Sequence, residues 1–494
     1  MHGDAAAPTG SARDHARRRE NVIPDVIVVG AGPAGVAAAL RAADLGAKTT
    51  LLTRDEFGGM AANDGPIPVR TLAHAARLLR EARQLERYGI GVDALTLDYS
   101  KLLRRVLEVV TEARSHAAYR EQIDAAGAVV HERTGAARFV DPHTIETDNG
   151  LKLRADKIVI CTGGKSRRLT VPGAELTATH SDAWSLRSVP ASMLVIGGGA
   201  TGAQVASIFS GFGAKVQLFQ SGPRIIPTED EDVSAAVAAG FREAGMIVRE
   251  SFGEIESFQA VHGGVRMTFV RDGRRESAEA ELAVVAIGWT AETEDLNLGA
   301  ASVETTSRGF VGVDSHLQTS ASHIFAAGDV TGRLMLVPQA LQDGFMAATN
   351  AVLGPTRTLD EHPAPIGSFT DPEYAQVGLT EAKARAEHDV AVSVARFDSA
   401  MRTIIDGRTA GFCKLIVERG SGKILGCHVV GERAVDIAQL AAVAMSARTS
   451  VDALARVPLS FPTHAGILGR AAAQAARELN RDTASSSQRE VHAS

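Results

Sequence analysis

Two glycine-rich segments of the chain have the spacing of a loop that cradles phosphate groups. The first (residues 30–35) reads Gly-Ala-Gly-Pro-Ala-Gly, and the second (residues 197–202) reads Gly-Gly-Gly-Ala-Thr-Gly. In such a G-x-G-x-x-G loop the first glycine permits a tight turn, the second lets a pyrophosphate approach the backbone, and the third lets helix and strand pack closely. The N-terminus of the following helix stabilises the phosphate charge. Each loop therefore predicts a dinucleotide site.

The surrounding residues predict the elements that hold the two loops. Short apolar runs at residues 25–30 and 193–196 indicate buried parallel strands, and each is followed by a helix and a second strand. The two loops begin 197 − 30 = 167 residues apart, about one domain length. Two dinucleotides in one chain indicate electron transfer between them, usually between a flavin and a nicotinamide.

Cysteine is scarce in this chain of 494 residues, which has only Cys161, Cys413 and Cys427. Three widely spaced cysteines exclude a disulfide scaffold and a cysteine-rich zinc module, and we expect no metal site. Cys161 lies in a predicted buried strand. We interpret Cys413 and Cys427 as small core residues in adjacent strands.

The length favours about three domains, and composition narrows the class of protein. Basic and acidic residues number 52 and 58, a net charge of −6, so no general attraction to nucleic acid or anionic membranes is expected. No apolar run is long enough to span a membrane, and Arg17, Arg18 and Arg19 are followed by no apolar signal segment. We therefore expect a cytoplasmic protein without membrane insertion.

Helices are expected at residues 71–88 and 99–121, where apolar residues recur at helical spacing. Apolar strands that open into glycine are expected at 158–164, 282–288 and 324–329, and ligands of α/β sheets bind at such strand ends. From about residue 362 the pattern changes, and residues 366–475 indicate an α+β domain.

In this order the segments resemble the pyridine nucleotide–disulfide oxidoreductases, a family that includes dihydrolipoamide dehydrogenase, glutathione reductase, mercuric reductase and soluble transhydrogenase. The resemblance covers about residues 24–475. It rests on both glycine loops, Gly58-Gly59, Cys161-Thr162-Gly163, residues 319–329, and the segment Phe-Thr-Asp-Pro-Glu-Tyr-Ala-Gln-Val-Gly-Leu-Thr-Glu at 369–381.

The resemblance implies an α/β fold with two Rossmann-like dinucleotide-binding domains and an α+β C-terminal dimerisation domain, hence a homodimer. The implied divisions are a disordered leader (1–23), an FAD-binding domain (24–171 and 293–358), an NAD(P)-binding domain (172–292), a dimerisation domain (359–478) and a disordered tail (479–494). The implied FAD contacts are Gly30, Gly32, Pro33, Ala34, Gly35, Thr53, Gly59, Met60, Ala136, Thr162, Gly163 and Asp329. The implied NAD(P) contacts are Gly197, Gly199, Ala200, Thr201, Gly202, Gln220, Arg224 and Gly288.

Two of these positions lack the acidic residue that binds ribose hydroxyls. Thr53 stands where the FAD site would have a glutamate, with Asp55 or Glu56 as possible substitutes. Gln220 stands at the equivalent position of the nicotinamide site, and Arg224 is the nearest downstream cation. Because no carboxylate is placed to repel a 2′-phosphate, this pattern leans toward NADPH.

The redox positions differ from the family pattern. Ala61 and Pro66 occupy the two thiol positions, and neither can attack a disulfide. Phe461 replaces the acid/base histidine and cannot exchange a proton. His464, three residues later, is either a displaced acid/base or an ordinary loop histidine.

A charge pair near the reactive edge of the flavin has also changed. Arg70 and Gln204 replace the family's lysine and glutamate, so the cation stays while the carboxylate is lost. A retained cation would favour the anionic reduced flavin. The alternative is that Arg70 lies on the surface of its helix.

Together these features predict an FAD-dependent NAD(P)H oxidoreductase that passes electrons directly to a small diffusible acceptor such as a quinone. Three alternatives stay open at this point. They are a soluble pyridine nucleotide transhydrogenase, a degenerate flavoprotein with little turnover, and a dithiol reductase that uses a thiol from elsewhere.

Overall fold

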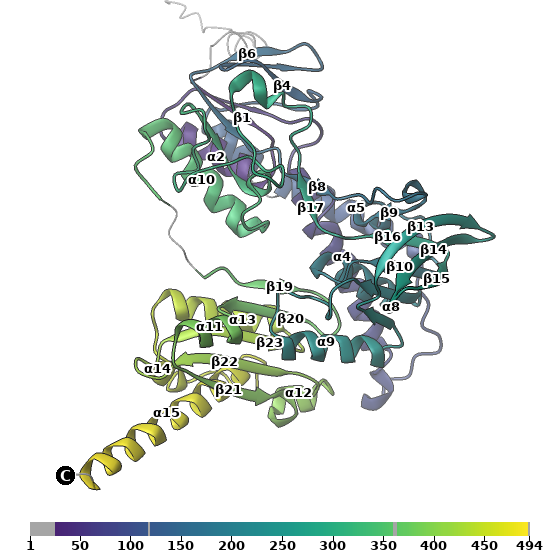
Figure 1. Ribbon diagram of the computed structural model, residues 1–494, viewed down its shortest axis with the longest axis vertical. Coiled ribbons are helices and arrows are strands. Elements are labelled where there is room, and N and C mark those ends of the chain that lie inside the picture. Colours follow the sequence, from purple (N-terminus) through teal and green to yellow (C-terminus); the bar gives the residue numbers. More distant parts are fainter. Residues whose placement is uncertain (1–24, 117–118, 359–362, 493–494) are drawn as a thin grey trace, which may run out of the picture. The chain divides into compact units, whose positions relative to one another are not determined.

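The computed structural model describes residues 25–116, 119–358 and 363–492 (Figure 1). The expected disordered leader lies outside these residues. The chain divides into two compact units. Unit 1 comprises Met1–Ile67, Val110–Lys165 and Thr290–Asp360, and unit 2 comprises Pro68–Val109, Ser166–Trp289 and Glu361–Ser494.

Unit 1 is built on a parallel five-stranded sheet in the order β18-β7-β1-β2-β3. The strands are β1 (Val26–Val29), β2 (Thr49–Leu52), β3 (Val129–His131), β7 (Lys157–Ile160) and β18 (Ile324–Ala326). β1, β2 and β18 are buried throughout, as expected for apolar runs in a parallel sheet.

Helices α2 (Pro33–Asp44) and α10 (Val337–Leu353) pack on one face of this sheet through alanines. They approach so closely that a Cβ on Gly344 would lie 2.0 Å from the Ala34 carbonyl oxygen. The remaining elements of unit 1 include an antiparallel sheet, short helices and 3₁₀ turns: β4 (Ala137–Asp141), β5 (Thr144–Thr147), β6 (Lys152–Arg154), α3 (Gly59–Asn63), α6 (Tyr119–Ala125), η3 (Leu298–Ala301) and η4 (Gly328–Thr331).

The first half of unit 2 repeats the parallel arrangement in the order β12-β11-β10-β16-β9. Its elements are β9 (Ala178–Thr179), α7 (His180–Trp184), β10 (Ser192–Ile196), α8 (Ala200–Phe212), β11 (Lys215–Gln220), α9 (Glu231–Glu243), β12 (Ile247–Glu250) and β16 (Leu282–Val285), together with the antiparallel strands β13 (Glu254–Val261), β14 (Gly264–Arg271) and β15 (Arg274–Ala280). Strands β8 (Gly164–Ser166) and β17 (Trp289–Ala291) form a separate two-stranded ladder, and the chain passes from one unit to the other within each of these strands. A 3₁₀ turn of unit 2, η2, spans Ala174–Leu176.

The C-terminal part of unit 2 is an antiparallel sheet in the order β19-β20-β23-β22-β21, packed against helices. The strands are β19 (Ile366–Ser368), β20 (Tyr374–Gly378), β21 (Val390–Arg396), β22 (Phe412–Glu418) and β23 (Ile424–Val430). The helices are α11 (Glu381–Glu387), α12 (Met401–Ile405), α13 (Ala434–Ser446), α14 (Val451–Ala455) and α15 (Gly466–His492), with the 3₁₀ turn η5 at Phe397–Ser399. The predicted placement of Cys413 and Cys427 in adjacent strands is confirmed.

A buried ion cluster joins the two halves of unit 2. Lys414, whose side chain is 2% exposed, lies 2.9 Å from Asp230, 2.7 Å from Asp232 and 3.3 Å from Glu381. His428 lies on the neighbouring strand with Nε2 3.4 Å from Asp230. Because a buried ammonium requires compensation, these carboxylates tie the start of α9 to the antiparallel sheet.

The region between the first glycine loop and residue 125 differs from the expected two long helices. Helix α4 begins earlier and spans Pro66–Ala82, and a separate 3₁₀ turn, η1, follows at Leu85–Tyr88. Proline fits the first turn of a helix, which explains the early start. The second expected helix is divided into α5 (Tyr99–His116) and α6, with residues 117–118 outside the described part.

Two further differences concern the expected boundaries. The tail was expected to be disordered from residue 479, but α15 continues to His492, because the alanine-, glutamine- and arginine-rich run that starts the helix favours its propagation. Residues Pro68–Val109 group with unit 2, not with the FAD-binding segment. The described helices include none long and apolar enough to cross a membrane.

Candidate functional site

The first glycine loop has the geometry that a bound pyrophosphate requires. Gly30 has a φ of +108°, and a Cβ there would lie 2.2 Å from the Cys161 carbonyl oxygen. A Cβ on Gly35 would lie 1.7 Å from the Gly30 carbonyl oxygen, so the start of α2 packs directly on the turn. Around Gly32 the space is open, and the nearest atom to an added Cβ is 4.0 Å away. The first and third glycines are therefore structural, and the second leaves room for a ligand.

The second loop repeats this pattern. A Cβ on Gly197 (φ +103°) would lie 2.3 Å from the Ala286 carbonyl oxygen, and one on Gly202 would lie 1.8 Å from the Gly197 carbonyl oxygen. No atom of the described residues lies within 4 Å of a Cβ added at Gly199. Neither α2 nor α8 has a side-chain cap at its N-terminal glycine, so backbone N–H groups in the first turn stay free for phosphate oxygens.

Several residues expected to contact FAD come together around the first loop. Gly59 has a φ of +57°, and a Cβ there would lie 2.6 Å from the Gly32 Cα. Thr162 is the second residue after β7, and its buried hydroxyl has no hydrogen-bond partner among the described residues. A Cβ on Gly328, next to Asp329, would lie 2.9 Å from the Ala34 Cβ. Thr162 and the segment with Asp329 therefore lie beside the loop, and their contact with FAD stays a prediction.

The chemistry of these groups fits a flavin dinucleotide. Burial, together with the nearby Asp343, raises the pKa of Asp329 to about 6. The partly buried carboxyl of Asp329 and the unpaired hydroxyl of Thr162 both need polar partners, and the hydroxyl-rich chain of FAD could provide them. The residues of unit 1 therefore fit the cofactor.

The predicted site for the adenine ribose of FAD has fewer polar side chains available to bind the ribose hydroxyls. Thr53 is buried, and its backbone pairs with His131 and Thr134. Glu56 is paired with Arg133 at 2.6 Å, which lowers the pKa of Glu56 and occupies one candidate substitute. The Ala136 N–H donates to Asp148 at 2.8 Å. Asp55 is the acidic candidate left for the ribose.

The residues expected to select the nicotinamide cofactor have partners within the protein. The Gly198 N–H donates to Gln220 Oε1 at 2.9 Å, so the amide is held against the glycine loop. Arg224 turns toward its own loop and donates to the carbonyl oxygens of Pro227 and Glu229 at 3.2 and 3.1 Å. The guanidinium of Arg224, the cation that would favour NADPH, is therefore occupied by hydrogen bonds to backbone carbonyl oxygens. Gly288 has a φ of +106° and open space around it.

Arg70 and Gln204, 134 residues apart, are brought together. Arg70 Nη1 donates to Gln204 Oε1 at 2.6 Å, and the guanidinium carbon lies 3.4 Å from the centre of the Phe369 ring. Burial lowers the pKa of Arg70 to about 10, partly offset by Glu373. The partner that the guanidinium contacts is thus a neutral amide, and the alternative of a surface arginine is wrong.

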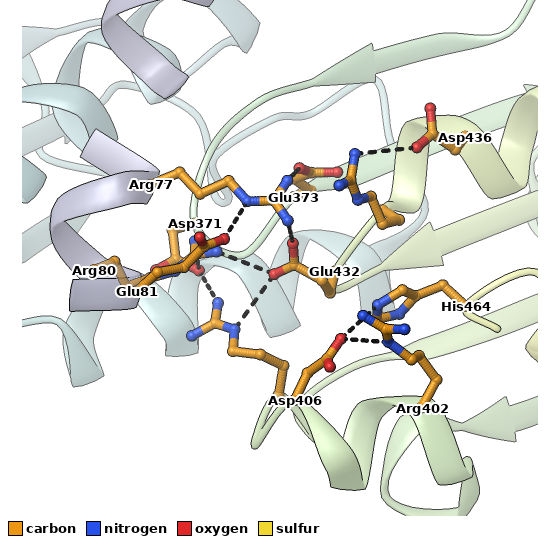
Figure 2. Close-up of polar contacts among 12 residues, drawn as sticks. Arg77, Arg80, Glu81, Asp371, Glu373, Arg402, Asp406, Glu432, Asp436 and His464 are labelled. Carbon is orange, nitrogen blue, oxygen red and sulfur yellow. Dashed lines mark hydrogen bonds and ion pairs between the residues drawn. The ribbon is translucent and has the colours of Figure 1, made fainter. Parts of the chain in front are cut away.

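Sequence reasoning missed a network of ion pairs that continues along α4 (Figure 2). Arg80 lies 2.9 Å from Asp371 and 3.0 Å from Glu432, and Arg77 pairs with Glu432 and lies 3.8 Å from Glu373. Burial and the neighbouring Glu432 raise the pKa of Glu373 to about 7. The arginines at positions 70, 77 and 80 share one helix face, a spacing that could have indicated this interface.

His464 has a carboxylate partner in the structure. Its Nε2 lies 3.0 Å from Asp406, to which Arg402 also donates at 2.8 Å (Figure 2). Its buried Nδ1 has no hydrogen-bond partner in the described part of the chain. Burial alone would raise the pKa of Asp406, but the hydrogen bonds from Arg402 and His464 hold it below its ordinary range. Phe461, which the resemblance implies at the position of the family's histidine, is 79% exposed.

All three cysteines are buried thiols. Burial raises the pKa of Cys161 far above its ordinary range. The Cys413 and Cys427 sulfurs lie 3.9 Å apart in the core of the antiparallel sheet, and their mutual contact raises the pKa of Cys413. Ala61 lies in α3, and Pro66 starts α4.

Among the described residues no group of three His, Cys, Asp or Glu side chains could hold a metal ion.

Comparisons with known proteins agree with this geometry. Residues 24–344 match the family model described as pyridine nucleotide-disulphide oxidoreductase, and residues 364–472 match its dimerisation domain. The chain is 31% identical to a mercuric reductase of Bacillus cereus over 427 residues, which are 85% of this chain and 66% of that protein. It is 32% identical to dihydrolipoyl dehydrogenases of Chlorobaculum tepidum and Mycobacterium tuberculosis, covering 84% of this chain and 88% and 89% of theirs.

Solved structures show the same fold. The Escherichia coli protein RclA, described as an HOCl-induced flavoprotein disulfide reductase in complex with Cu(II), superposes with a TM-score of 0.82 over 92% of this chain and 99% of its own, at 24% identity. Members of the matched family use FAD and NAD(P)H, in agreement with the two glycine loops. The fold, the two dinucleotide loops and the matched models together identify the chain as a member of the pyridine nucleotide–disulfide oxidoreductase family.

Proposed function

We propose that the protein is an FAD-dependent NAD(P)H oxidoreductase that passes electrons directly to a small diffusible acceptor, such as a quinone, without a dithiol. The observation that carries this proposal is the state of the cysteines. All three are buried, and Ala61 and Pro66 occupy the segment that would carry the reactive pair. Because the thiolate is the nucleophile, a buried thiol with a raised pKa is a poor redox group.

A bound FAD would supply the capacity to take up hydride from the nicotinamide and to release electrons to the acceptor, and this chemistry needs no thiol. The protein residues hold and polarise the participants. Gly32 and Gly199 leave the backbone open to the two pyrophosphates. Arg70 supplies a positive charge whose partner is neutral, so that charge remains available to stabilise negative charge that develops nearby.

His464 is our candidate for the proton source. A histidine hydrogen-bonded to a carboxylate has the arrangement of a general acid/base.

The match to the family's dimerisation domain supports a homodimer. Met401, Ile404, Val457 and Phe461 are exposed apolar side chains of that domain and suit a subunit interface. A cytoplasmic location is part of the proposal, because a chain with only three cysteines does not depend on disulfides.

Stoichiometry of reduction tests the proposal. In an anaerobic titration of the FAD-loaded protein, one equivalent of NADPH or NADH per FAD should complete the bleaching of the flavin, because no dithiol takes up a second electron pair. A quinone should then restore the oxidised spectrum, whereas lipoamide or glutathione disulfide should not. Bleaching that requires two equivalents would overturn the proposal, and so would reoxidation by a disulfide. Failure of both nucleotides to bleach the flavin would favour the degenerate flavoprotein.

The same preparation separates the acceptor role from transhydrogenation. Reoxidation of the reduced protein by the oxidised form of the other nicotinamide, at a rate equal to or above that with the quinone, would favour a transhydrogenase. His464→Ala should slow reoxidation by the quinone at least tenfold and leave reduction by the nicotinamide unchanged. Equal slowing of both steps would show that His464 supports the fold and donates no proton.

A further inference from the structure

A cavity of about 570 Å³ lies within unit 2, alongside helix α4. Its walls are formed by α4, the C-terminal half of α8, the residues that precede β20, and the start of α13. The volume falls in the range of small-molecule sites. Ala73, Ala76, Ile208, Met246 and Val435 provide apolar wall surface. The cavity can therefore accommodate the apolar body of a ligand.

The charges that line the cavity are predominantly positive. The lining includes five arginines, at positions 70, 77, 80, 83 and 433, and three carboxylates, at 371, 373 and 436. Glu432, which is not among the lining residues, pairs with both Arg77 and Arg80. Arg77 and Arg80 are paired with carboxylates (Figure 2), and Arg433 lies 3.6 Å from Asp436. These pairings leave Arg70 and Arg83 as the lining arginines that pair with no carboxylate among the described residues.

Neither Arg70 nor Arg83 forms an ion pair with a carboxylate in the described part of the chain. Arg70 donates to the neutral amide of Gln204 and stacks on Phe369, while Glu373 affects it only through space. Arg83 donates to the Gly211 carbonyl oxygen at 3.2 Å. Burial lowers the pKa of Arg70 to about 10, a sign that its charge is poorly compensated. A desolvated guanidinium beside an open cavity is a receptor for an anion.

We propose that this cavity binds a small organic carboxylate with an apolar body. The carboxylate pairs with the guanidinium of Arg70, and the apolar body lies along Ala73, Ala76 and Ile208. Arg83 is exposed and attracts the anion at the entrance of the cavity. This proposal shares Arg70 with the proposed function, but it concerns binding, which calorimetry measures independently of turnover.

Binding of 2-naphthoate to the full-length, FAD-loaded protein tests the proposal by isothermal titration calorimetry. The neutral isostere 2-naphthamide should bind at least tenfold more weakly, because it cannot pair with Arg70. Benzoate should bind more weakly than 2-naphthoate, because it buries less apolar surface. Equal affinity for the acid and the amide would overturn the proposal.

Three variants locate the ligand. Arg83→Ala should weaken 2-naphthoate binding several-fold, and Ser210→Phe should abolish it by filling the cavity from α8. Arg274→Ala, which removes an exposed arginine outside the cavity, should leave the affinity unchanged. Arg70→Met should weaken binding of the acid and leave binding of the amide unchanged. An affinity that is the same in all of these variants would overturn the proposal, whether or not any one of them folds poorly.

Discussion

Replacing Gln204 with glutamate tests whether Arg70 is an uncompensated cation in the folded protein. The substitution keeps the shape of the side chain and places a carboxylate oxygen where Gln204 Oε1 now accepts from Arg70 Nη1 at 2.6 Å. Burial lowers the pKa of Arg70 to about 10. A base whose pKa is lower in the folded than in the unfolded chain destabilises the fold at every pH below the folded pKa.

The size of the effect follows from that pKa. Holding Arg70 charged at pH 7 costs the folded state about 3 kcal/mol, at 1.36 kcal/mol per pKa unit. A glutamate at position 204 recovers only part of this, because the new carboxylate must itself be desolvated. It also loses the weak hydrogen bond from Gln204 Nε2 to the Ala200 carbonyl oxygen at 3.4 Å. We expect Gln204→Glu to raise the free energy of unfolding by about 1–2 kcal/mol.

The assay is denaturant unfolding of the FAD-saturated protein at several pH values. The gain from Gln204→Glu should be present at pH 7 and disappear as the pH falls below about 4, where the new carboxylate becomes protonated. Gln204→Met serves as the control, because it removes the hydrogen bond without adding charge, and should destabilise by about 1–3 kcal/mol. If Gln204→Glu is no more stable than the wild type at pH 7, the inference about Arg70 is wrong.

Three further predictions address the rest of unit 2. Lys414→Met should destabilise the protein by about 3–5 kcal/mol in denaturant unfolding, because Asp230 would lose its buried cation, and a loss below 1 kcal/mol would contradict the role of the ion cluster. Burial raises the pKa of Glu229 to about 8, so wild-type stability should fall between its unfolded pKa and pH 8, by at most about 1.4 kcal/mol per pH unit, and Glu229→Gln should flatten that slope. Because Gln220 is neutral and Arg224 faces its own loop, kcat/KM for NADH and NADPH should differ by less than about tenfold, and Gln220→Glu should shift the ratio toward NADH. A wild-type ratio above about a hundred in steady-state kinetics would refute this view of the site.

Local sequence was enough to predict the two strand–loop–helix units. The glycines at positions 30, 35, 197 and 202 are required because a Cβ there would clash with backbone atoms of the same strand–loop–helix motif or of the segment that follows the neighbouring strand. The spacing of these glycines therefore predicts the motif. The strands β1, β2, β10 and β11 follow from short apolar runs, because both faces of a parallel sheet are buried. Comparison of the same segments with the family pattern then located Ala61, Pro66 and Phe461.

Side-chain partners could not be predicted in this way. Arg224 was a plausible phosphate ligand in the sequence, but its guanidinium is held by the carbonyl oxygens of Pro227 and Glu229. His464 was one loop histidine among fifteen, and only folding places it 3.0 Å from Asp406. Such contacts depend on loop conformation and on which polar atoms packing leaves unpaired, and neither has a local signature.

Residue types at short, regular spacing were thus enough to predict the two dinucleotide loops and the family, and they are the basis for proposing that the redox thiols are lost. The tertiary structure decided that α4 faces the segment that leads into β20, and thus which of its arginines are neutralised. Arg77 and Arg80 meet carboxylates from more than 280 positions away, whereas Arg70 meets an amide and Arg83 a backbone carbonyl. The physical reason is that the energy of a charge depends on its surroundings after burial, and distant segments supply those surroundings only when the chain folds.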